Sequence, residues 1–144
     1  MNRRLFAWMS APLLAAFALI TLGAPRSARA ADMSFSLKYD VPPAKKGERT
    51  IVKVHLVPGA GYHVNKDFPT SLVIAPPVGL SVEKPRQAAK DATLLAEAGA
   101  DFEVALTASE GGSKLVTGDF KFAVCSATSC DPKKEKVSFT VNIK

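Results

Sequence analysis

The chain has 144 residues, of which 19 are lysine or arginine and 13 are aspartate or glutamate, so its formal net charge is +6. Four of the basic residues and none of the acidic ones lie in the first thirty residues, which leaves 15 basic against 13 acidic residues in the remainder. Because that remainder is nearly balanced in charge, we expect no nucleic acid or charged membrane surface as its partner.

The first thirty residues have the pattern of an export signal. Two arginines give a positive start, residues 5–22 are almost entirely apolar, and residues 28–30 (Ala-Arg-Ala) form a small-x-small cleavage site. We therefore predict a removable signal peptide over residues 1–30 and one domain over residues 31–144. The rest of the chain has no apolar run of membrane-spanning length, so we expect a periplasmic protein without a transmembrane segment.

The pattern after the signal is β throughout. Several segments alternate apolar and polar residues, which places successive side chains on opposite faces of a strand. The predicted strands are Met33–Asp40, Thr50–Val57, Ser71–Ala75, Gly79–Glu83, Phe102–Ala108, Lys114–Val124 and Val137–Ile143. The segment Lys84–Ala100 is instead rich in helix formers and is expected to hold a short helix or a long loop.

Seven or eight short strands, each with one apolar face, favour two antiparallel sheets packed face to face. We therefore predict an all-β fold, an immunoglobulin-like antiparallel β-sandwich. A small closed barrel is the alternative that the strand pattern leaves open.

The only two cysteines, Cys125 and Cys130, follow a strongly alternating strand. Its large apolar residues Phe120, Phe122 and Val124 share one face, so Cys125 is predicted on the outward face with an accessible thiol. Two cysteines in an exported protein predict a disulfide.

A Cys125–Cys130 bridge would be a weak structural link. It closes a loop of only six residues, which in the chain-entropy model contributes about 2 kcal/mol, against about 4 kcal/mol for a loop of some seventy residues. Thiol–disulfide exchange instead needs an accessible sulfur and a thiolate. Lysines at 121, 133, 134 and 136 favour a thiolate and Asp131 opposes it.

The run V-C-S-A-T-S-C-D-P-K-K-E-K-V-S-F-T-V, residues 124–141, resembles the cysteine segment of the DsbD amino-terminal-domain family, periplasmic domains of thiol:disulfide interchange proteins. That family has two cysteines a few residues apart, a proline shortly after the second, and then a closing strand. Residues 61–65 (Gly-Tyr-His-Val-Asn) are similar to its glycine–aromatic segment. The resemblance covers residues 35–143.

The resemblance implies an immunoglobulin-like domain that accepts electrons through Cys125 and Cys130 and passes them to exported disulfide proteins. Such a domain is one component of a protein-disulfide reductase system. It needs no cofactor, and a separate membrane protein supplies its electrons. Tyr62, His63 and Asn65 match positions near the redox pair, and His63 suits proton transfer to a leaving thiolate.

The chain departs from the family at the loop that shields the cysteines. The family's well-known members carry phenylalanine and tyrosine in this loop, whereas the corresponding stretch here, Glu83–Gly99, has no aromatic residue. The resemblance therefore supports the family's fold for this chain more strongly than it supports the family's electron-transfer partners.

Two other classes of function remain open from the sequence. One is a non-enzymatic immunoglobulin-like interaction module whose small disulfide is only structural. The other is copper binding by Cys125, Cys130, His63 and His55, but these residues form no tight motif, and we expect no metal. The chain shows no phosphate-binding loop and no hydrolase or metalloprotease motif.

Overall fold

The structure is a computed structural model that describes residues 34–144; the predicted signal peptide lies outside the described residues. The elements are β1 (Phe35–Asp40), β2 (Arg49–Pro58), β3 (His63–Val64), β4 (Ser71–Ala75), β5 (Leu80–Val82), β6 (Arg86–Ala88), the 3-10 turn η1 (Ala89–Asp91), β7 (Leu94–Ala96), β8 (Gly99–Ala108), β9 (Gly112–Cys125) and β10 (Cys130–Ile143). Within this part of the chain, no helix is long and apolar enough to cross a membrane.

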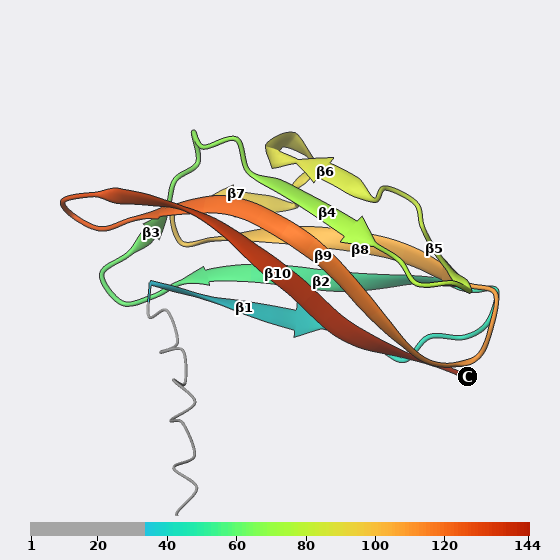
Figure 1. The fold of residues 1–144 in the computed structure, drawn as a ribbon. Helices are drawn as coiled ribbons and strands as arrows, with labels where there is room; N and C mark the ends of the chain where they lie inside the picture. The colour runs from blue at the N-terminus through green and yellow to red at the C-terminus, as the bar shows by residue number, and fades with distance from the viewer. Residues whose placement is uncertain (1–33) are drawn as a thin grey trace, which may run out of the picture. The chain divides into compact units, whose positions relative to one another are not determined.

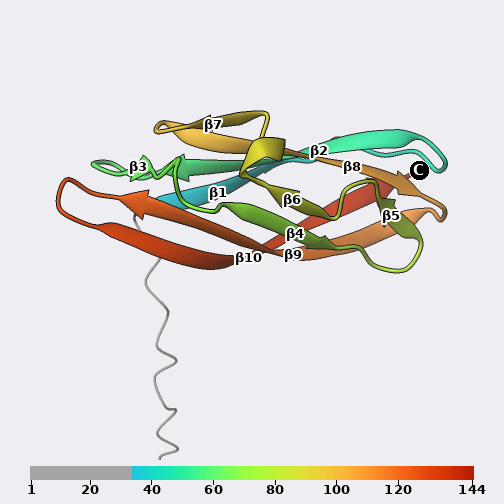
Figure 2. The same ribbon diagram turned by 90° about the horizontal axis from the view of Figure 1, so that it is seen from above.

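The strands form two antiparallel sheets that pack face to face (Figures 1 and 2). Sheet A has the order β1-β2-β8-β5, with β7 also paired to β8. Sheet B has the order β10-β9-β4-β6, with β3 also paired to β9. The predicted all-β sandwich is confirmed, and the two sheets do not close into a barrel.

The strand order follows immunoglobulin topology, in which the first two strands share one sheet and the last two share the other. After β1 the chain crosses to sheet B, where Ala44 bridges Ile143 in parallel and its N–H donates to the Asn142 carbonyl at 2.9 Å. The chain departs from this topology between β4 and β8, where the short strands β5, β6 and β7 alternate between the two sheets.

The core fills the space between the sheets with the apolar side chains of alternating strand positions. Phe102 of sheet A and Phe120 of sheet B meet edge to face, with ring centroids 5.4 Å apart, and both are fully buried. Phe122 continues the cluster at 5.0 Å from Phe120 and contacts Phe35 at 4.9 Å. Such aromatic pairs stabilise the sandwich beyond the area they bury.

The segment Lys84–Ala100 contains two short strands and one 3-10 turn rather than an α-helix. Its helix formers are overridden because β6 pairs with β4 and β7 pairs with β8. The amide of Gln87, buried in β6, donates to the Glu103 carbonyl of the other sheet at 2.9 Å.

Strand β10 begins at Cys130, seven residues before the predicted start at Val137, and includes Pro132. Because Asn142 and Lys144 bond to Ala44, the even-numbered residues of β10 direct their backbone groups away from β9. Pro132 has this orientation on an edge strand, so its missing N–H costs no bond to β9.

Candidate functional site

The two cysteines form a disulfide at the tip of the β9–β10 hairpin. Cys125 ends β9, Cys130 begins β10, and the two residues are directly opposite each other in the register. In both ribbon views this tip is the outermost part of its end of the domain (Figures 1 and 2). The disulfide therefore lies at one end of the domain.

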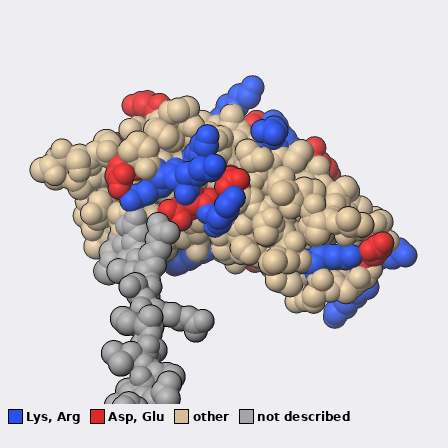
Figure 3. All heavy atoms as spheres, viewed as in Figure 1, with Lys and Arg blue, Asp and Glu red and all other residues tan. Residues whose placement is uncertain are grey.

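The loop between the cysteines, residues 126–129, has its own hydrogen bonds. The N–H of Ser126 donates to the Ser129 carbonyl at 2.7 Å, and its Oγ accepts from the N–H groups of Thr128 and Ser129 at 3.3 and 3.2 Å. The loop carries no charged residue, and the corresponding end of the surface is uncharged in Figure 3. These bonds and the β9–β10 pairing hold the strand ends together independently of the disulfide.

The two cysteines differ in exposure. Cys125 is only 4% exposed, whereas Cys130 is exposed. The prediction of an accessible Cys125 is therefore wrong. Strand alternation gives the direction of a side chain but not its neighbours, and β9 lies here between β3 and β10, whose residues cover a small side chain. Cys130, on the edge strand, is the accessible member of the pair.

The structure places His63 beside Cys125. In the two-residue strand β3, His63 is opposite Cys125 and Val64 is opposite Val124. Both valines are fully buried, so His63 and Cys125 lie together on the outer face of sheet B. His63, Cys125 and Cys130 thus form one row across β3, β9 and β10, which we call the cysteine row.

The other two predicted supporting residues lie at the ends of β3. Tyr62 precedes the strand, is 39% exposed, and its N–H donates to the Gly59 carbonyl at 3.0 Å. Asn65 donates its N–H to the Ala123 carbonyl at 2.9 Å. Its side-chain Oδ1 accepts from the Asp67 N–H at 3.0 Å, so this side chain stabilises the turn after β3.

The lysines around the cysteine pair stabilise a thiolate less than their number suggests. Lys121 and Lys134 are opposite each other, each four residues along its strand from a cysteine. That spacing is about 13 Å between Cα atoms, longer than the screening length of about 8 Å at physiological salt. Lys133 is paired with Asp131 at 2.5 Å and Lys136 with Asp119 at 2.7 Å.

The stretch that the resemblance predicts as a shielding loop, residues 83–99, approaches β3 through Glu97. The Val64 N–H donates to the Glu97 carbonyl at 2.9 Å, and Lys66 Nζ lies 3.8 Å from Glu97 Oε1. This contact fixes β3 beside β9 but brings no aromatic ring over the disulfide, because residues 83–99 contain none.

Of the four residues considered for copper, three lie in the cysteine row, where the two cysteines are joined to each other, and the fourth is distant from them. His55 lies on the outer face of sheet A, where its Nδ1 is 2.7 Å from Oδ1 of Asp101. The cysteine row is on the outer face of the other sheet. Within residues 34–144, no group of three histidine, cysteine or acidic side chains is arranged to hold a metal ion.

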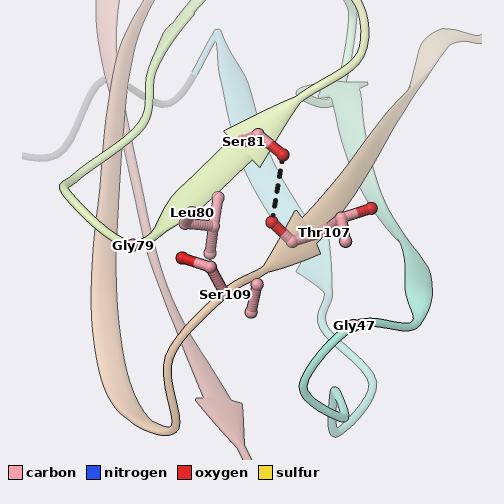
Figure 4. Close-up of a pocket in the computed structure, with 7 residues that line it drawn as sticks. Gly47, Gly79, Leu80, Ser81, Thr107 and Ser109 are labelled. Carbon is pink, nitrogen blue, oxygen red and sulfur yellow. Dashed lines mark hydrogen bonds between the residues drawn. The ribbon is translucent and has the colours of Figure 1, made fainter.

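A surface hollow of about 390 Å³ lies at the far end of β8, away from the cysteines (Figure 4). It is lined by small residues, among them Gly79 and Ser81, and the Ser81 hydroxyl donates to the Thr107 carbonyl at 3.2 Å. None of its lining side chains is ionisable, so it offers no group for acid–base or nucleophilic chemistry.

No protein-family model and no curated protein sequence matches the chain. Among solved structures it is similar to domains 4 and 5 of the S-layer protein SbsC, at 15% identity and a TM-score of 0.38, over 76% of this chain and 50% of that one. It is also similar to AggA, the major subunit of aggregative adherence fimbriae type I from Escherichia coli, at 7% identity and a TM-score of 0.40, over 76% and 94%. AvmM, which catalyses macrocyclization in alchivemycin A biosynthesis, is similar at 13% identity and a TM-score of 0.34, over 77% and 90%. Likenesses this distant carry no argument about function.

Proposed function

We propose that the domain is a periplasmic thiol–disulfide exchanger of the DsbD amino-terminal-domain type. In this proposal the Cys125–Cys130 pair takes electrons from a separate membrane protein and passes them to exported disulfide proteins. The observation that carries the proposal is the disulfide at the outermost tip of the hairpin, where Cys130 is exposed and the bridge closes a very short loop.

The exposure difference assigns the two sulfurs different roles in reduction. A donor thiolate attacks Sγ of Cys130, the disulfide breaks, and its electron pair stays on Sγ of Cys125. The donor is then joined to Cys130 in a mixed disulfide. A second donor thiolate attacks the donor's own sulfur, which releases Cys130 as a thiolate and leaves the donor oxidised. Two electrons thus enter the pair, and protons from solvent complete the two thiols.

A structural disulfide in a non-enzymatic interaction module is the second candidate. It is favoured by the burial of Cys125 and by the continuous β9–β10 pairing, which already holds the two residues together. In that case the bridge would stay closed as long as the hairpin is folded.

Reduction of the folded wild-type protein separates these candidates, and two single-cysteine variants test the roles assigned to the two sulfurs. Cys125→Ala leaves the exposed Cys130 and Cys130→Ser leaves the buried Cys125. We expect Cys130 to react with an aromatic disulfide reagent at least about ten times faster than Cys125. In the wild type, dithiothreitol should open the bridge while circular dichroism still shows the native fold. Equal labelling of both variants would contradict the roles assigned to the two sulfurs, and reduction only in urea would favour the structural disulfide.

A further inference from the structure

The cysteine row places a histidine directly opposite the residue whose sulfur leaves during reduction. Asn65 bonds to Ala123, so the odd-numbered residues of β9 direct their backbone groups toward β3. His63 and Cys125 are therefore a hydrogen-bonded type of pair, with Cα atoms about 5.5 Å apart and side chains on the same face. His63 is exposed, so its ring exchanges protons with solvent.

No other charged strand residue on this face lies as close to Cys125. Lys121 and Lys134 are four residues along β9 and β10, and Asp119 and Lys136 lie beyond them in their own ion pair. Asp131 and Lys133 alternate to the opposite side of β10 and pair with each other. Lys66 and Glu97, near the end of β3, are also paired. His63 is therefore the group best placed to act on Cys125.

We propose that His63 is the proton donor to the leaving sulfur of Cys125, an inference that rests on the proposed exchange at Cys130. When a nucleophile bonds to Sγ of Cys130, the disulfide breaks and its electron pair moves to Sγ of Cys125. The protonated ring of His63 transfers a proton to that sulfur, which leaves a neutral histidine and a Cys125 thiol. Solvent then reprotonates the ring. Because the assistance requires the protonated ring, it is stronger at acidic pH than at alkaline pH.

The test compares reduction rates of the folded, oxidised wild type and His63→Gln from pH 5.5 to 8. The reductant is tris(hydroxypropyl)phosphine, whose reactive, unprotonated form carries no charge. Its phosphorus attacks Cys130, and water then converts the phosphonium to phosphine oxide and frees the Cys130 thiol. Because both proteins meet the same reductant, its own pH dependence cancels in the ratio of their rates.

We expect the wild type to react at least about five times faster than His63→Gln at pH 5.5, with the ratio falling toward one by pH 8. His55→Gln is the matched control, because it removes the chain's other histidine on the far sheet and should keep the wild-type profile. A ratio that stays the same across this pH range would overturn the role of His63 but not the proposed exchange. If the wild type is not reduced while folded, the exchange function itself fails.

Discussion

At the scale of single residues, neighbours decide what each side chain of the hairpin can do. Cys125 and Cys130 have the same chemistry, but one is on an inner strand and 4% exposed and the other is exposed on the edge strand. Asp119, on the same outer face, bonds to Lys136 at 2.7 Å. That bond, helped by the charges of Lys134 and Lys121, holds the pKa of the Asp119 carboxyl below its usual value.

The lowered pKa of Asp119 predicts a specific loss of stability in acid. The ionised carboxylate is favoured in the folded state, so its contribution is present above the unfolded pKa of about 3.9 and is lost as the pH falls through the lower folded pKa. We expect wild type to be more stable than Asp119→Asn at pH 7 and the difference to disappear toward pH 2.5. Urea unfolding at several pH values measures it.

A substitution of Lys136, the partner of Asp119, is the control for that experiment. Lys136→Met should also be less stable than the wild type at pH 7, and this loss of stability should also shrink toward pH 2.5. The reason is that the bond from Lys136 is the main cause of the lowered pKa of Asp119. A difference between wild type and Asp119→Asn that stays constant down to pH 2.5 would show that Asp119 is not held ionised by the fold.

At the scale of elements, the β9–β10 hairpin connects the core to the tip. Its inward positions, such as Val116 and Phe120, are fully buried, and the same two strands continue outward to the cysteines. Position 118 of β9 requires glycine, because a Cβ there would overlap the Val73 carbonyl oxygen of β4. The glycine allows β4 and β9 to approach closely.

We predict that Gly118→Ala destabilises the domain by about 1–3 kcal/mol, because a backbone atom cannot move aside as a side chain can. Gly111→Ala is the control, since its Cβ would lie 3.6 Å from the Ile143 carbonyl oxygen, an ordinary contact. Its effect should be within about 0.5 kcal/mol. Chemical unfolding of both variants measures the difference, and equal effects would contradict the close approach at Gly118.

Local patterns in the sequence predict the elements better than the site. The alternation in β2 and β8 gives correct strands and inward faces, since period-two burial depends only on the strand itself. The strands within Lys84–Ala100 are missed because pairing with distant partners overrides local propensity. For the same reason local patterns do not show the cover over Cys125. The position of His63 near the cysteines, 62 residues later in the chain, is predicted only by the family resemblance, and the register places it opposite Cys125.

At the scale of the whole molecule, the core that stabilises the fold and the proposed exchange site lie in different places. The sandwich is held by the apolar contact between its sheets, including Phe102 and Phe120, whereas the disulfide lies at one end and closes a loop of six residues. We therefore expect the fold to be independent of the state of the cysteines. The proposed exchange requires this, because an exchanger must remain folded both oxidised and reduced.

We predict that the double variant Cys125→Ala, Cys130→Ser keeps the native fold and loses about 2 kcal/mol of unfolding free energy. Phe120→Ala provides the comparison, with an expected loss of about 3–5 kcal/mol because it empties a fully buried position between the sheets. Urea unfolding and circular dichroism measure both. A double variant that fails to fold would show that the bridge is an essential structural link.

The reduction potential of the folded protein tests the proposed exchange most directly. The oxidised protein is equilibrated without denaturant in glutathione redox buffers, with dithiothreitol buffers for the most reducing potentials, and its thiols are counted by alkylation and mass. We predict a transition from no thiol to two thiols at a potential between about −270 and −120 mV, the range of known exchangers. A bridge that stays closed until below about −300 mV would contradict the proposal and identify a structural disulfide.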